Sequence, residues 1–174
     1  MKTKTQRVLA ILHIMAWIIF VGLCIQTCGT LTSFVVSLYK PGIVDKMYIK
    51  LHLSGLQQYD SNAYSAIVGF MIGISAAKAF IAYLTIKIFS TLNLADPFSA
   101  GVAGLVERIS IVAFVAALFA IVAASYSDWL SKRGISIPYD WAAGELLLLA
   151  GVIYVIAQVF KRGIELQSEN DLTI

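Results

Sequence analysis

Four long apolar stretches dominate the chain, and most of the charged residues lie in the short segments between them. We predict that each stretch is a membrane-spanning helix, at about residues 8–37, 63–89, 105–127 and 142–161. Each has at least the roughly 20 residues that a helix needs to cross a bilayer. The pattern predicts an all-α integral membrane protein, a bundle of four transmembrane helices in one domain (1–174) with a polar tail at 162–174.

The second half of the first span carries a polar stripe formed by Gln26, Thr30, Ser33 and Ser37. Their spacing of i, i+4, i+7 and i+11 places them on one face of a helix. Polar side chains on such a face are expected to meet another helix or an external loop and not lipid.

Two of the segments between spans alternate between apolar and polar residues, at 49–54 and 134–138. This alternation is typical of a short strand with one covered face. Each strand alone would be marginal, so we predict a pair of short β-strands that caps the bundle on its outer side.

The third helix is predicted to begin before its apolar stretch, at Asp96 and Pro97. Asp is a favourable N-cap, and Pro suits the first position of a helix. A helix that begins there reaches Arg108 before it enters uncharged sequence, so its first turns are expected to lie in the membrane interface.

Composition supports the membrane prediction. The chain is 59% hydrophobic and only 13% charged, whereas soluble domains contain about 25% charged residues.

With both termini placed in the cytosol, seven Lys and Arg residues fall inside (Lys2, Lys4, Arg7, Lys87, Arg108, Lys161, Arg162) and five outside (Lys40, Lys46, Lys50, Lys132, Arg133). The positive-inside rule favours this orientation. Aromatic residues agree, because they gather at the outer boundary: Tyr39, Tyr59, Tyr64, Tyr126, Trp129, Tyr139 and Trp141.

Four polar residues fall within or beside the spans: Gln26, Lys78, Glu107 and Glu145. Lys78 has two open interpretations: an ion or ligand site, or a structural lysine that reaches the interface or pairs with Glu107. Glu145 is expected one turn inside the outer edge, near Lys132 or Arg133 or facing water. It should differ from Lys78 in depth by roughly 15 Å.

The sequence predicts no enzyme. No nucleophile, base and orienting group can be assembled, and no cofactor or metal motif occurs. His13 and His52 lack the further ligands that a metal site needs, and Cys24 and Cys28 are interpreted as small packing residues. The sequence contains no basic patch interleaved with aromatic residues, so direct nucleic-acid binding is not expected. Gly69 and Gly73 form a GxxxG motif that would permit a close helix contact.

Two polar segments, NLADPFS (Asn93 to Ser99) and FKRGIELQSENDLTI (Phe160 to Ile174), resemble a bacterial family of four-span membrane proteins, the domain of unknown function 2975. The resemblance covers nearly the whole chain, and the tail is its most specific part. It implies no biochemical activity and no catalytic residues. It does imply a genetic association with small helix-turn-helix regulators, and a place in the bacterial cytoplasmic (inner) membrane.

We therefore expect a non-enzymatic membrane partner or tether of a cytosolic helix-turn-helix transcription regulator. The expected contacts lie before the third span and in the tail: Asp96, Pro97, Phe98, Glu165, Glu169, Asn170, Asp171, Leu172 and Ile174. The alternative is a small transporter or channel-like subunit with Gln26, Lys78 and Glu145 along its pathway. The lipid bilayer is the other expected partner, no cofactor is expected, and a homo-oligomer remains open.

Overall fold

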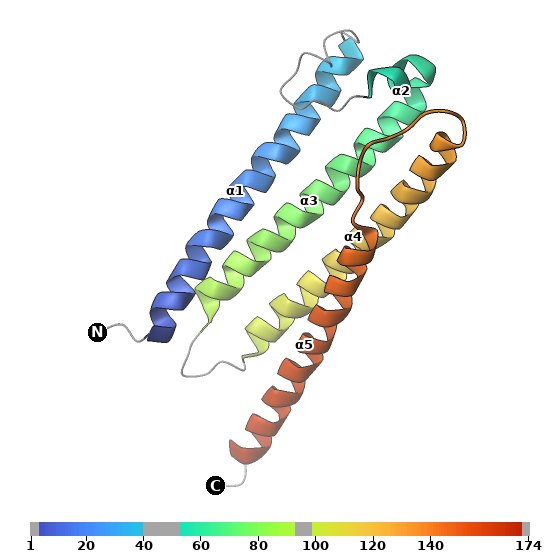
Figure 1. Ribbon diagram of the computed structural model, residues 1–174. Coiled ribbons are helices and arrows are strands. Elements are labelled where there is room, and N and C mark those ends of the chain that lie inside the picture. Colours follow the sequence, from blue (N-terminus) through green and yellow to red (C-terminus); the bar gives the residue numbers. More distant parts are fainter. Residues whose placement is uncertain (1–3, 40–52, 93–98, 172–174) are drawn as a thin grey trace.

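The computed structural model describes residues 4–39, 53–92 and 99–171, which form five α-helices and no strand (Figure 1). The bounds are α1 (Lys4–Tyr39), α2 (Ser54–Tyr59), α3 (Ser61–Thr91), α4 (Ala100–Ser131) and α5 (Ala143–Asp171). All but α2 are long and apolar enough to cross a membrane. A helix suits hydrocarbon because it satisfies its own backbone N–H and C=O groups. The chain therefore has the all-helical architecture of a multi-pass membrane protein, as predicted.

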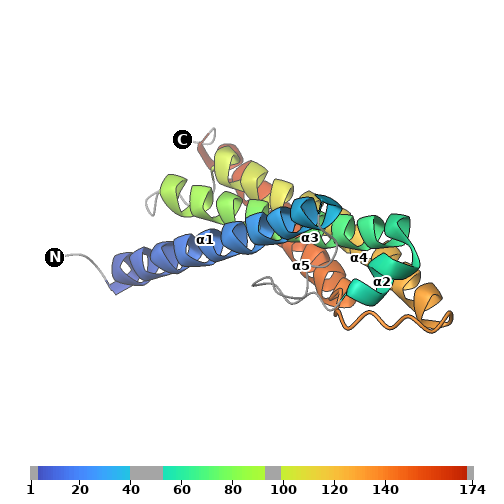
Figure 2. The ribbon, with the colours of Figure 1, turned by 90° about the horizontal axis from the view of Figure 1, so that it is seen from above.

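Consecutive long helices run antiparallel, so both termini lie at one end of the molecule, which we call the terminal end (Figures 1 and 2). The opposite, distal end carries α2 and the connection between α4 and α5, residues 132–142. Which side of a membrane each end faces remains a prediction.

The four long helices form an open row in chain order. Helix α1 packs on α3, α3 packs on α4, and α4 packs on α5. Within the described ranges, no Cα atom of α1 comes within 8 Å of one in α4 or α5. The described helices therefore do not close into a ring, and α1 and α5 each pack against one other long helix.

The largest core lies at the distal end. It combines side chains from α2, α3, α4 and the α4–α5 connection, among them Leu56, Tyr64, Ile67, Leu130 and Trp141. Tyr64 is fully buried and donates a hydrogen bond from its hydroxyl to Ser37 Oγ of α1 at 3.0 Å. The predicted polar stripe of α1 thus faces α3 through Thr30, Ser33 and Ser37, which are all buried, whereas Gln26 is exposed.

Helix α4 packs through small side chains. Its buried face contains the alanines Ala113, Ala116, Ala117, Ala120 and Ala123, each at most 2% exposed. Small residues let helix backbones approach closely within a membrane. The GxxxG motif of α3 has no such role here, because a Cβ at Gly69 would meet nothing within 4 Å and one at Gly73 only a Phe119 ring carbon at 4.0 Å.

Helix α5 is displaced toward the terminal end. Ser110 Oγ donates to the carbonyl of Ala150 at 3.1 Å, which fixes the level of α5 against α4. By this register α5 begins near the level of Ala117, about 21 Å short of the distal end of α4 at 1.5 Å per residue. At the other end α5 continues about 16 Å past the first residue of α4 (Figure 1).

The predicted strand pair is not found. Residues 49–52 lie outside the described part of the chain, and residues 134–138 follow α4 without forming a strand. Gly134, at φ +87°, closes α4 instead: its N–H bonds to the carbonyl of Ser131, and the Ile135 N–H bonds to that of Leu130. This is a Schellman motif, and it uses Gly134 and Ile135 as helix cap residues.

The start of the third span also differs from the prediction. Asp96 and Pro97 fall outside the described residues, and α4 begins at Ala100. Ser99 is its N-cap, with Oγ accepting from the Val102 N–H at 3.4 Å. A serine at this position satisfies a free amide of the first turn, as the aspartate was expected to do.

Candidate functional site

Charged side chains gather at the terminal end, where α4 and α5 are joined by an ion pair. Lys161 Nζ lies 2.7 Å from Glu107 Oε1. Side chains on a helix tilt toward its N-terminus, so on antiparallel helices these two side chains lean toward each other. The pair is half-exposed, with 42% of the Lys161 and 35% of the Glu107 side chain accessible.

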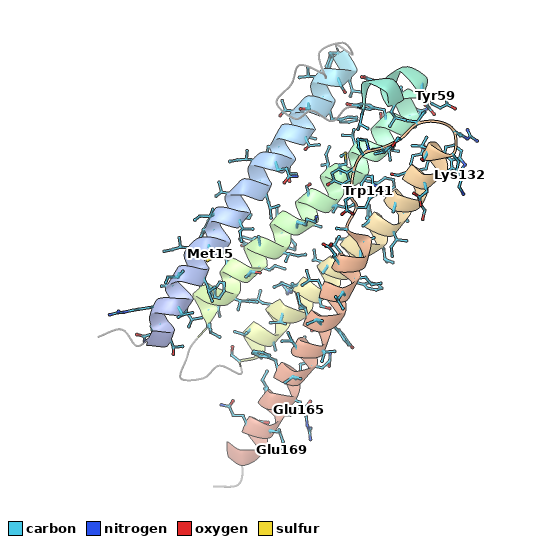
Figure 3. The ribbon with its side chains drawn as sticks, viewed as in Figure 1. Met15, Tyr59, Lys132, Trp141, Glu165 and Glu169 are labelled. Carbon is cyan, nitrogen blue, oxygen red and sulfur yellow. The ribbon has the colours of Figure 1, made fainter. Side chains whose placement is uncertain are left out.

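Beyond this pair α5 projects from the bundle, and Glu165 and Glu169 stand on the projecting part (Figure 3). We call residues 163–171 the α5 extension. Glu165 accepts a hydrogen bond from Arg162 Nη1 at 2.6 Å, and its carbonyl accepts from Ser168 Oγ at 2.8 Å. Leu166 is 47% exposed. The predicted polar tail is thus helical up to Asp171.

The predicted partner contacts are only partly visible. Glu165 and Glu169 lie exposed on the α5 extension, and Asn170 and Asp171 belong to its last turn. The other predicted contacts lie outside the described residues: Asp96, Pro97, Phe98, Leu172 and Ile174.

The polar residues of the spans do not form one site. Gln26 is exposed on α1, Lys78 is half-buried on α3, and Glu145 is exposed on α5. Of the interpretations left open for Lys78, pairing with Glu107 is not found, because Glu107 bonds to Lys161. Among the described residues, neither Lys78 nor Glu145 takes part in an ion pair.

Glu145 lies at a different level than expected. The displacement of α5 places it beside the middle of α4 and not one turn inside the distal end. Phe70 of α3 meets Phe119 of α4, and counting along the antiparallel helices from this contact puts Lys78 near the level of Ile111. Glu145 and Lys78 therefore differ in depth by about 6 Å and not by the expected value of roughly 15 Å. Arg133, an expected neighbour of Glu145, instead lies over the Trp129 ring, 3.8 Å from its centroid.

The histidine and the cysteines of α1 have ordinary structural surroundings. His13 Nε2 accepts a hydrogen bond from the Trp17 indole at 3.1 Å, and its ring stacks on Phe89 of α3. Cys24 and Cys28 are free thiols. In the part of the chain that the structure covers, no three His, Cys, Asp or Glu residues are grouped as metal ligands would be.

Of the aromatic residues predicted at the outer boundary, Tyr39, Tyr59 and Trp129 are exposed, whereas Tyr64 and Trp141 are buried. Trp141 is 5% exposed, donates from its indole to Ser127 Oγ at 2.9 Å, and meets Tyr139 edge to face. Burial raises the pKa of the Tyr139 phenol, and the neighbouring Asp140 carboxylate raises it further. Tyr139 lies in the connection between α4 and α5, outside the long helices.

Sequence reasoning missed a hollow of about 320 Å³ between the last turns of α3 and the first turns of α4. We call it the α3–α4 hollow. Its described lining is Lys87, Thr91, Ala100, Gly101, Gly104, Leu105 and Arg108, so it contains two basic side chains and no acidic one. The sequence did contain a signal for this hollow, namely a basic residue near the end of one span, Lys87, and another near the start of the next, Arg108.

The comparisons with known proteins identify a family but no activity. A family model described as "Protein of unknown function (DUF2975)" matches residues 6–174. No curated protein and no solved structure matches the chain. The matched region includes all four long helices except the first two residues of α1, Lys4 and Thr5.

Proposed function

We propose that this chain, which belongs to the DUF2975 family, is a non-enzymatic membrane partner that tethers a cytosolic helix-turn-helix regulator. The observation that carries the proposal is the α5 extension, a helix that projects about 16 Å past α4. A helix that continues beyond its neighbours offers a preformed surface, so a partner need not order it on binding.

The chemistry of the α5 extension favours a basic partner. From Gly163 to Ile174 the chain has three acidic residues, Glu165, Glu169 and Asp171, and no basic one. An exposed leucine, Leu166, stands among them. DNA-binding domains carry basic surfaces, and an acidic helix with an apolar residue is complementary to such a surface.

The proposed location is the bacterial cytoplasmic membrane, with both termini in the cytosol. The support is the excess of Lys and Arg in the short segments at the terminal end. In this orientation the α5 extension reaches the compartment where a transcription regulator works.

The test is co-expression of the full chain with a small helix-turn-helix regulator of the kind that the family resemblance implies, followed by separation of membranes from cytosol. Deletion of Ser168–Ile174 should move most of the regulator from the membrane fraction to the soluble fraction. The double charge reversal of Glu165→Lys and Glu169→Lys should do the same in a full-length chain.

The matched control is Glu145→Lys, which reverses an exposed acid on the same helix away from the extension. It should leave the regulator on the membrane. Retention of the regulator at the wild-type level by both the truncated and the charge-reversed chains, with normal membrane insertion, would contradict the proposal.

The transporter alternative gains no support from the geometry. Its pathway candidates, Gln26, Lys78 and Glu145, stand on three different helices, and α1 and α5 are not neighbours. A transport pathway needs these groups to converge on one cavity, and no such arrangement occurs among the described residues.

A further inference from the structure

We propose that the α3–α4 hollow binds a phosphate-bearing anion, namely the phosphate of an anionic lipid headgroup. Lys87 comes from the penultimate turn of α3, and Arg108 lies two turns into α4. The two cations therefore reach the same hollow from different helices. Basic pockets between transmembrane helices are a recurrent mode of anionic headgroup recognition.

The two cations have no protein counter-ion among the described residues. The acid nearest to Arg108 in the chain is Glu107, and it already bonds to Lys161 at 2.7 Å. Neither Lys87 nor Arg108 takes part in an ion pair in the described ranges. A phosphate could therefore contact both without displacing an existing partner, and Arg in particular offers a planar fork that fits two phosphate oxygens.

The walls of the hollow suit a bulky headgroup. Its floor on α4 is formed by Ala100, Gly101 and Gly104. A Cβ added at Gly101 or Gly104 would meet nothing within 4 Å, so both glycines border open space. The volume of about 320 Å³ is at the lower end of small-ligand sites, which suits a headgroup phosphate with its glycerol. Thr91 adds a hydroxyl to the lining.

The level of the hollow matches that of lipid headgroups. Charged residues of three helices, Lys87, Arg108 and Lys161, gather at this end of the apolar spans. Long basic side chains place their charges at the membrane interface. Leu105 adds an apolar side chain to the same lining, although most of it is buried in the core with Leu84 and Ile109.

The experiment measures lipid binding to the purified full chain by native mass spectrometry, with phosphatidylglycerol as the anionic probe and phosphatidylcholine as the zwitterionic one. The wild type should prefer the anionic lipid. The double variant Lys87→Gln and Arg108→Gln should lose roughly 30-fold in affinity for it. A composition-matched control, Arg7→Gln with Lys132→Gln, removes the same charge elsewhere and should lose less than about 3-fold.

A second variant tests the shape of the hollow with both charges intact. Gly104→Leu fills the hollow, and because its Cβ meets no atom, the helix should remain as stable as wild type. It should reduce binding of the anionic lipid at least as strongly as the charge variant. Gly22→Leu, at an open glycine of α1, is the control that should bind normally.

A third arm identifies the source of the phosphate. Inorganic phosphate at millimolar concentration should not displace phosphatidylglycerol, because it lacks the acyl chain. If inorganic phosphate did displace phosphatidylglycerol from the wild type but not from the double variant, the hollow would be assigned to a soluble phosphate. The lipid assignment would then be overturned. Equal losses in the charge variant and its control, or wild-type binding by Gly104→Leu, would overturn the site itself.

Discussion

The two ends of the molecule are built on opposite principles. At the distal end, α2, α3, α4 and the α4–α5 connection share one core, in which Tyr64 and Trp141 are buried and hydrogen-bonded. At the terminal end, the helices end at different levels, charged side chains are exposed, and a hollow lies between the last turns of α3 and the first turns of α4.

The contrast teaches where stability and interaction reside. Buried aromatic and aliphatic side chains dominate packing energy, whereas exposed charges contribute little to it. The distal end therefore holds the largest core, while two smaller clusters, around Leu84 and Ile109 and around Val106 and Ala157, join α3, α4 and α5 toward the terminal end. The terminal end can change its charges and contacts at low cost, which suits a surface that meets lipids and partners.

The largest difference in stability loss between the two ends is expected when an aromatic side chain is removed. Trp141→Ala, in the distal core, should lower the free energy of unfolding by about 3–5 kcal/mol through loss of packing and of the bond to Ser127. Trp17→Ala, at an exposed position near the terminal end, should cost about 0.5 kcal/mol. Equilibrium unfolding in mixed detergent micelles, followed by circular dichroism, measures both. Equal losses would refute the contrast.

Replacement of a small residue by leucine should have the next largest effect on stability. Ala117→Leu inserts a side chain into a fully buried contact of α4 and should destabilise the fold by about 1–3 kcal/mol. Gly69→Leu makes a larger change in volume, but its Cβ meets nothing within 4 Å. That variant should keep or slightly raise stability in the same assay, since leucine favours a helix over glycine by less than about 1 kcal/mol. The opposite ranking would mean that α3 has an unseen partner at Gly69.

The ion pair at the terminal end should contribute less. In a double-mutant cycle of Glu107→Gln and Lys161→Gln, we expect a coupling free energy between about 0 and 1 kcal/mol, because both side chains are more than one-third exposed. The coupling should shrink as salt is raised from 0.05 to about 1 M, since salt screens exposed charges. A larger, salt-independent coupling would show that the terminal end is buried in its native setting.

Alkaline pH should produce the smallest effect, confined to the distal end. The raised pKa of Tyr139 means that the folded state holds its phenol proton more tightly than the unfolded chain does. This contribution is complete below about pH 10 and is lost as the pH rises through the folded pKa, so stability should decline there. Tyr139→Phe should flatten the decline seen in thermal unfolding between pH 9 and about 11. Tyr59→Phe, at an exposed position, should leave it unchanged.

The membrane helices were predictable from the sequence because apolar length alone determines them. The predicted spans 8–37, 63–89, 105–127 and 142–161 all lie within the long helices except for one residue, Ala142. The polar stripe on α1 was also readable, since helical spacing shows which residues share a face. Each of these inferences needs only local information.

What the sequence could not show depends on register between helices. Glu107 and Lys161 are separated by 54 positions in the chain, and only the displacement of α5 decides that they meet. That displacement follows from the connection 132–142, where Ile135 and Ile137 pack against the distal core. Their alternation with polar residues was interpreted as a strand. The same alternation also occurs in an extended segment that packs its apolar side chains against neighbouring helices without pairing with another strand.

Motif searches were a poor guide to helix contacts for a related reason. The GxxxG of α3 was conspicuous, whereas the alanines of α4 were not, and the structure uses the alanines. A small residue permits a close approach but does not supply the neighbour. The neighbour is determined by how the row is arranged.

The chain-ordered row also has a consequence for biogenesis. During synthesis the N-terminal helices reach the bilayer first, and each new long helix finds an earlier long helix on which it packs: α3 finds α1, α4 finds α3, and α5 finds α4. No helix has to wait for a distant, later segment before it can pack. Assembly can therefore proceed stepwise as the ribosome advances, with the loop-closure entropy of each step kept small.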